Sequence, residues 1–111
     1  MTVTVKVLVP AQSLANTQTI LYTAAGVTAI IDKFTATNYS GTAATISVNI
    51  VNPAGSAGND NLIVKTKTLQ ASETYTFPEL VGHMVASGGT ISAVAGSASA
   101  INVRASGREV T

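Results

Sequence analysis

The stretch ATISVNIV, residues 44–51, alternates apolar and polar side chains from Ala44 to Ile50. A period of two is typical of a β-strand with one buried face, because successive side chains on a strand point to opposite sides. The pattern predicts that Ile46, Val48 and Ile50 face a core, while the threonine, serine and asparagine between them face away. This segment is the clearest strand in the sequence.

The same alternation recurs on both sides of this strand. At the start of the chain Val3, Val5, Val7 and Val9 alternate with other residues, so we predict a strand over Thr2–Val9 that ends at Pro10. A longer strand is expected over residues 27–39, where the apolar positions change phase, which indicates either a β-bulge or burial on both faces. Further strands are expected at residues 18–23, 62–69, 74–77, 90–95 and 100–106. Within them, Ile20 and Tyr22 should share one face, Lys67 should lie on the face opposite Val64, and Arg104 should point outward. The predicted core contains Ile46, Val48, Ile50, Ile91, Ile101 and Val103.

Turn-forming residues separate these strands, and no segment has a sustained helical period. Ala24-Ala25-Gly26 predicts a turn, the irregular stretch 11–16 could hold one helical turn, and Asn52–Asn61 (NPAGSAGNDN) predicts a long exposed loop. Many short strands at regular spacing favour an all-β fold. We therefore predict one domain over residues 1–111, an antiparallel, jelly-roll-like β-sandwich of about eight short strands.

The composition excludes several functional classes. The 111 residues include 46% hydrophobic and only 10% charged side chains, with a net charge of +1 and no cysteine. Six scattered lysines and arginines cannot form a nucleic-acid-binding surface. No apolar stretch is long enough to span a membrane, and no signal peptide is visible. We expect synthesis in the cytoplasm and no nucleic-acid or membrane partner.

The side chains that could perform chemistry are sparse. His83 is the only histidine. If the protein were a hydrolase, His83 would have to lie close to a carboxylate in a pocket. The loop segment Asn59-Asp60-Asn61 has one carboxylate, whereas calcium sites use several, so we expect an ordinary turn there. We predict no catalytic residue, no metal site and no cofactor, and we do not expect an enzyme.

Three segments of the sequence carry a resemblance to a known group of proteins. They are LYTAAGVTAIIDKFTATNYSGTAATISVNIV at 21–51, LIVKTKTLQASETYTFPELV at 62–81 and GGTISAVAGSASAINVRASGREVT at 88–111. In cadence these segments resemble small virion proteins of tailed bacteriophages. Within that group, the length of the chain and its single domain resemble the capsid decoration (cement or staple) proteins of short-tailed double-stranded DNA phages. The resemblance implies a β-sandwich on the capsid exterior that clamps neighbouring subunits of the major capsid protein. It assigns no individual residue.

Two other functions remain open at this stage. The same cadence occurs in phage tail and fibre-associated modules, and a glycan- or receptor-binding sandwich would need an exposed aromatic cluster, for which Tyr39 and Tyr22 are the candidates. A homodimer is a further candidate assembly, because two-fold contacts are common.

With so few charges, we expect a partner to be bound by sheet edges, loops and apolar surface. The elements we expect to make contact are the strand Thr2–Val9, the loop Asn52–Asn61 and the tail Gly107–Thr111. The candidate contact residues are Thr2, Val3, Val5, Val7, Asn52, Asn59, Asp60, Asn61, Arg108 and Val110.

Overall fold

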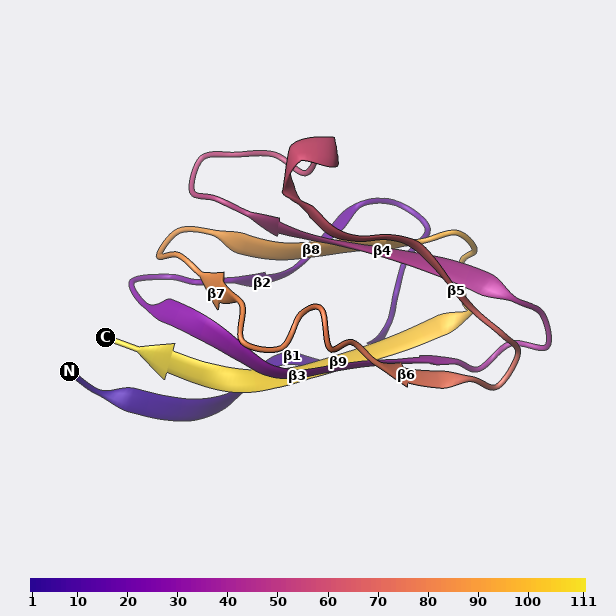
Figure 1. Ribbon diagram of the computed structural model, residues 1–111, viewed down its shortest axis with the longest axis horizontal. Helices are drawn as coiled ribbons and strands as arrows, with labels where there is room; N and C mark the ends of the chain where they lie inside the picture. Colours follow the sequence, from indigo (N-terminus) through magenta and orange to yellow (C-terminus); the bar gives the residue numbers. More distant parts are fainter.

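The computed structural model describes residues 1–111 and contains two antiparallel sheets packed face to face (Figure 1). Strands hold 58% of the residues, and the one helical element is the short 3-10 turn η1 (Asn59–Asn61). No helix in the structure has the length and hydropathy needed to cross a membrane. The strands are β1 (Val3–Ser13), β2 (Thr19–Thr23), β3 (Thr28–Asn38), β4 (Ala44–Val51), β5 (Leu62–Leu69), β6 (Thr74–Thr76), β7 (Met84–Val85), β8 (Thr90–Ala95) and β9 (Ile101–Val110).

The order of the strands is that of a jelly roll. One sheet runs β1-β9-β3-β6, with the two-residue β7 paired to the other end of β3, and the second sheet runs β2-β8-β4-β5. With β7 left aside, each sheet alternates strands from the first half of the chain (β1–β4) with strands from the second half. Two interlocked Greek keys produce this order. The predicted all-β antiparallel sandwich is therefore confirmed, with nine strands in place of about eight.

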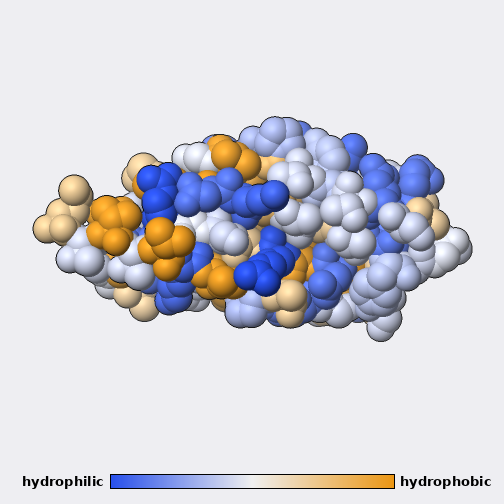
Figure 2. Space-filling model, turned by 90° about the horizontal axis from the view of Figure 1, so that it is seen from below, coloured by the Kyte–Doolittle hydropathy of each residue, from blue (hydrophilic) through white to orange (hydrophobic).

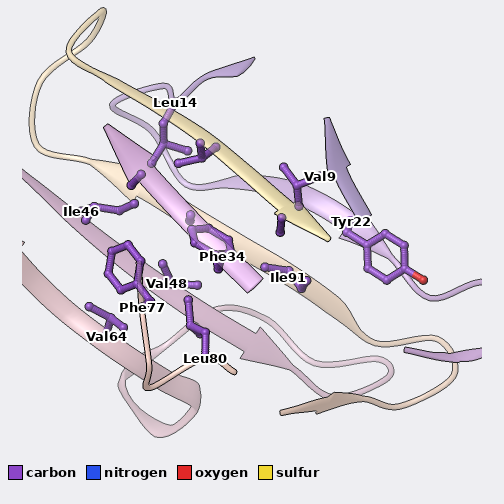
Figure 3. Packing of buried hydrophobic residues seen from close by; sticks show 14 of the residues in the cluster. Val9, Leu14, Tyr22, Phe34, Ile46, Val48, Val64, Phe77, Leu80 and Ile91 are labelled. Carbon is purple, nitrogen blue, oxygen red and sulfur yellow. The ribbon is translucent and has the colours of Figure 1, made fainter. Parts of the chain in front are cut away.

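A single hydrophobic core of 24 buried residues fills the space between the sheets (Figure 3). Its aromatic centre is Phe77, which packs edge-to-face against Phe34 and Tyr75 at centroid distances of 5.5 and 4.8 Å. Of the six predicted core residues five are buried, and Ile50 is half-buried at the margin of the same cluster.

The first strand departs from the prediction because it contains bulges. The register against β9 shifts between Val7 and Val9 and again before Gln12, so β1 continues through Pro10 to Ser13. Proline is tolerated here because β1 is an edge strand, where its missing N–H leaves no ladder bond unmade. The predictions that the strand ends at Pro10 and that residues 11–16 hold a helical turn were therefore wrong. The bulge also buries both Leu8 and Val9, whereas the valines before it face solvent.

Two further bulges reverse faces that the sequence pattern had assigned. In β2 the register shifts between Ile20 and Tyr22, so Ile20 is exposed while Tyr22 is buried. We had expected both on one face. In β5 the positive φ of Thr66 (46°) marks a bulge that brings Lys67 to the same side as Val64, where we had expected it on the opposite side. In β3 the change of phase comes from a bulge, the first of the two explanations that the sequence allowed, and it lies between Ile31 and Lys33.

The bulge in β5 turns the side chain of Lys67 toward the other sheet. Its ammonium nitrogen lies 4.5 Å from the centre of the Tyr75 ring. Since Lys67 is on β5 and Tyr75 is on β6, this cation–π contact joins the edge strands of the two sheets.

Candidate interaction surface

The two ends of the chain form a two-stranded ribbon, and it is the most exposed apolar part of the molecule. Val3 pairs with Val110, and Val5 pairs with Arg108, in an uninterrupted antiparallel register. Thr2 and Thr111 exchange backbone hydrogen bonds of 3.3 and 3.0 Å at the tip. Two of the three predicted contact elements, the N-terminal strand and the C-terminal tail, are thus brought side by side.

The outer edge of this ribbon has no partner within the chain. In an antiparallel pair, hydrogen-bonded residues alternate with non-hydrogen-bonded ones. Because Thr2 and Thr111 are a hydrogen-bonded pair, the N–H and C=O groups of Val3, Val5 and Val7 point away from β9. All residues from Met1 to Val7 are exposed, so these backbone groups are open to solvent. The edge is a ready template for another strand.

The valine side chains of the ribbon lie on the outer face of the first sheet. Val3, Val5 and Val7 are 52%, 82% and 40% exposed. Pairing places Val5, Arg108, Ile30 and Met84 in one row across four strands. Figure 2 looks at this face and shows hydrophobic residues gathered toward the end that carries the N-terminus, with mostly polar residues at the other end.

An ion pair neutralises the one cation in this apolar region. The Arg108 guanidinium donates to both carboxylate oxygens of Asp32, with nitrogen–oxygen distances of 2.8–3.2 Å. The hydrogen bonds that Arg108 donates to Asp32, together with the negative charge of Asp32, hold the pKa of Arg108 above its ordinary value. Arg108 therefore offers a partner a paired charge within an apolar surface.

A second charged cluster fastens the inner side of the ribbon to the body. The hydroxyl of Tyr22 on β2 donates to Glu109 at 2.5 Å, and the Lys6 ammonium lies 3.2 Å from the same carboxylate oxygen. The Tyr22 hydrogen bond and the Lys6 charge hold the pKa of Glu109 below its ordinary value, although desolvation acts in the opposite direction. Burial and the Glu109 carboxylate raise the pKa of Tyr22. These contacts hold β1 and β9 against β2.

Beyond the apolar region, the same face holds a polar depression that the sequence analysis did not single out. It has a volume of about 310 Å³, and Lys33 and Arg104 at its border make no ion pair. The alternation along 100–106 predicted that Arg104 points outward. The position of Lys33 near it could not be predicted, because it depends on how β3 pairs with β9. Its other lining residues are Thr35, Thr37, Asn102, Val103 and Ser106.

The third predicted contact element, the loop Asn52–Asn61, lies on the second sheet and apart from the ribbon (Figure 1). Asn61 anchors it, because its Oδ1 accepts hydrogen bonds from Asn49 Nδ2 at 2.7 Å and from the Gly58 N–H at 3.0 Å. Asn49 points outward from the core as predicted, but the loop covers it and leaves it 2% exposed. Asn52, Asn59 and Asp60 are exposed.

The residues considered for other functions are dispersed. His83 is exposed in a turn, and no side-chain hydrogen bond or ion pair links it to a carboxylate. No group of three or more histidines, aspartates or glutamates is placed to hold a metal ion. Tyr39 is 53% exposed and pairs its hydroxyl with Ser13 at 2.8 Å, whereas Tyr22 is buried, so the two do not form an aromatic platform.

The fold and this surface define a small jelly-roll sandwich with one open edge strand beside an apolar region. The chain matches no family model, no curated protein and no solved structure.

Proposed function

We propose that the protein is a virion structural protein that binds the outer surface of a bacteriophage capsid and clamps neighbouring subunits of the major capsid protein. The observation that carries the proposal is the apolar ribbon of β1 and β9, in which three valines are exposed next to a free strand edge. The resemblance of residues 21–51, 62–81 and 88–111 to phage decoration proteins supplies the identity of the partner.

The chemistry of the ribbon suits adhesion through apolar contact. Large exposed apolar patches on a soluble protein mark interaction sites, and a strand edge adds backbone hydrogen bonds to such a contact. The chain has two ion pairs, one on each side of the ribbon, and each joins two residues of this chain, so neither contributes an unpaired charge to a partner. Binding should therefore depend weakly on ionic strength, because salt screens exposed charges but not apolar contacts.

The rigid attachment of the ribbon supports the same function. The Tyr22–Glu109–Lys6 contacts fix it from inside, and Gly107 lets β9 lie close against β3. A partner that binds a preorganised surface does not have to order it, so less of the binding free energy is lost.

The test is to add purified protein to phage heads that lack it and to count the copies retained through washes of rising sodium chloride. We expect saturable binding to heads, not to separated tails, with copies retained at high salt. The triple variant Val3→Ser, Val5→Ser, Val7→Ser should lose binding. The control Val81→Ser, which changes an exposed valine in the turn before β7, should retain it.

Two results would contradict the proposal. Release of all copies at moderate salt would indicate electrostatic docking. Binding to tails alone would assign the protein to a tail or fibre assembly, which is the alternative that the sequence left open.

A further inference from the structure

We infer that the open edge of β1 pairs with β1 of a second copy of this chain, antiparallel, with Val5 facing Val5 across a two-fold axis. The inference deepens the proposed function and takes its biological role from it, but the pairing itself is a property of the isolated protein. The edge is free over Val3–Val7, where every residue is exposed.

The first argument is the match between backbone groups. Val3, Val5 and Val7 each direct an N–H and a C=O away from β9, as the Thr2–Thr111 hydrogen bonds determine. With Val5 on the axis, Val3 of one copy faces Val7 of the other. Each facing pair then forms two backbone hydrogen bonds, so all the free groups of the three valines are satisfied at once.

The second argument is the match between side chains. All three valines are on the outer face, so the two-fold axis places Val5 against Val5 and Val3 against Val7. On the inner side Thr4 of one copy faces Lys6 of the other. β-Branched cross-strand pairs stabilise sheets, and like charges that face each other destabilise them.

Other registers of the β1–β1 pairing would be less favourable. Moving the axis to Lys6 sets two ammonium groups directly opposite each other, which is unfavourable. Moving it to Thr4 pairs Val7 with Met1, which lies before the strand begins. The pattern of this strand is therefore self-complementary in one register, and this favours a second copy over an unrelated strand as its partner.

The pairing would turn one adhesive surface into a two-sided clamp. Antiparallel pairing about an axis perpendicular to the sheet makes the two β1-β9-β3-β6 sheets continuous and turns both apolar regions to the same side. Each copy could then hold one capsid subunit. Three residues per copy make a small contact, so we expect weak pairing in free solution and strong pairing on a shell, where the effective concentration is high.

The chain has no cysteine, so single-cysteine variants test the register without background. Facing residues of a hydrogen-bonded pair have Cα atoms about 5.5 Å apart, which a disulfide can bridge. In purified protein with no capsid present, Val5→Cys should form disulfide-linked dimers about tenfold faster, or more, than Val3→Cys or Val7→Cys alone. A mixture of Val3→Cys and Val7→Cys should cross-link rapidly. Ser97→Cys, in an exposed turn, measures random collision.

A second variant tests the backbone bonds. Val5→Pro removes an N–H that the monomer does not use, so the β1–β9 ladder should remain while the pairing is lost. Val5→Thr keeps the N–H and is the matched control. Sedimentation velocity at rising concentration should show a monomer–dimer equilibrium for wild type and Val5→Thr, and a monomer for Val5→Pro, with unchanged circular dichroism.

The inference is overturned if Val5→Cys cross-links no faster than Ser97→Cys, or if Val3→Cys cross-links with itself as fast as Val5→Cys. Dimers of Val5→Pro would also overturn it. Since no capsid enters these measurements, a monomeric result leaves the proposed function standing. A dimer that fails to bind heads would instead remove the proposed function alone.

Discussion

Gly107 lies where β9 passes between β1 and β3, and replacing it with alanine should be among the most destabilising small changes in this protein. It pairs with Lys6 on one side and Ile31 on the other and is buried. A β-carbon added there would lie 2.0 Å from the carbonyl oxygen of Ile30 and 2.8 Å from Cδ1 of Leu8. The first contact is with backbone, which cannot rotate away.

The magnitude follows from what must move. Overpacking a core usually costs about 1–3 kcal/mol, and the costs exceed this range when backbone has to shift. Because the β3 backbone must retreat at its own bulge, we expect Gly107→Ala to lower the free energy of unfolding by about 3 kcal/mol or more. At this chain length, that corresponds to a fall in Tm of roughly 10 °C or more.

The assay is urea unfolding followed by circular dichroism, with Gly41→Ala as the control. A β-carbon at Gly41 meets nothing within 4 Å, so that variant should stay within about 0.5 kcal/mol of wild type. If Gly107→Ala falls within the same range, β9 does not pass as close to β3 as described, and the placement of the ribbon is wrong.

Three other measurements address separate parts of the structure. Ile46→Ala should cost about 2–5 kcal/mol, and Ile50→Ala less, because Ile50 is only half-buried; equal losses in urea unfolding would contradict their different burial. The lowered pKa of Glu109 contributes stability above the ordinary glutamate pKa, and this contribution is lost as the pH falls through the folded-state value. Glu109→Gln should therefore lower Tm at pH 7 and converge with wild type in acid, whereas a constant difference at every pH would show that the charge is not responsible. His83→Ala should leave stability within about 0.5 kcal/mol and head binding intact; lost binding by a folded variant would give this histidine a function that the structure does not indicate.

The strands that could be predicted from the sequence are those without irregularity at their ends. The ranges expected for β4, β5 and β8 match the structure, because turn-forming residues bound each of them on both sides. The side of the sheet on which each side chain lies was less predictable. A bulge adds one residue and reverses every side chain after it, and nothing in the local pattern at Thr66 or between Ile20 and Tyr22 signals this.

The candidate surface could be predicted only in part. The N-terminal strand and the tail were each expected to make contact, but their pairing joins residues more than a hundred positions apart in sequence, as Val3 and Val110 show. The exposure of Val3, Val5 and Val7 could not be predicted from the sequence either. Val9 faces the core while Val5 faces solvent, although one regular alternation connects them in the sequence.

The cation–π contact between Lys67 and Tyr75 bears on how far association can proceed. A sandwich with two adhesive edges can add copies without end and grow into a fibre, whereas one with a single adhesive edge stops at two. Here the edge strands β5 and β6 are joined across the sandwich, β6 has only three residues and Pro78 follows it closely. An inward-pointing lysine at such an edge deters a further strand. Replacing Lys67 by valine would then do more than weaken one contact: if β1 pairs as we propose, the variant would have a second adhesive edge and could polymerise.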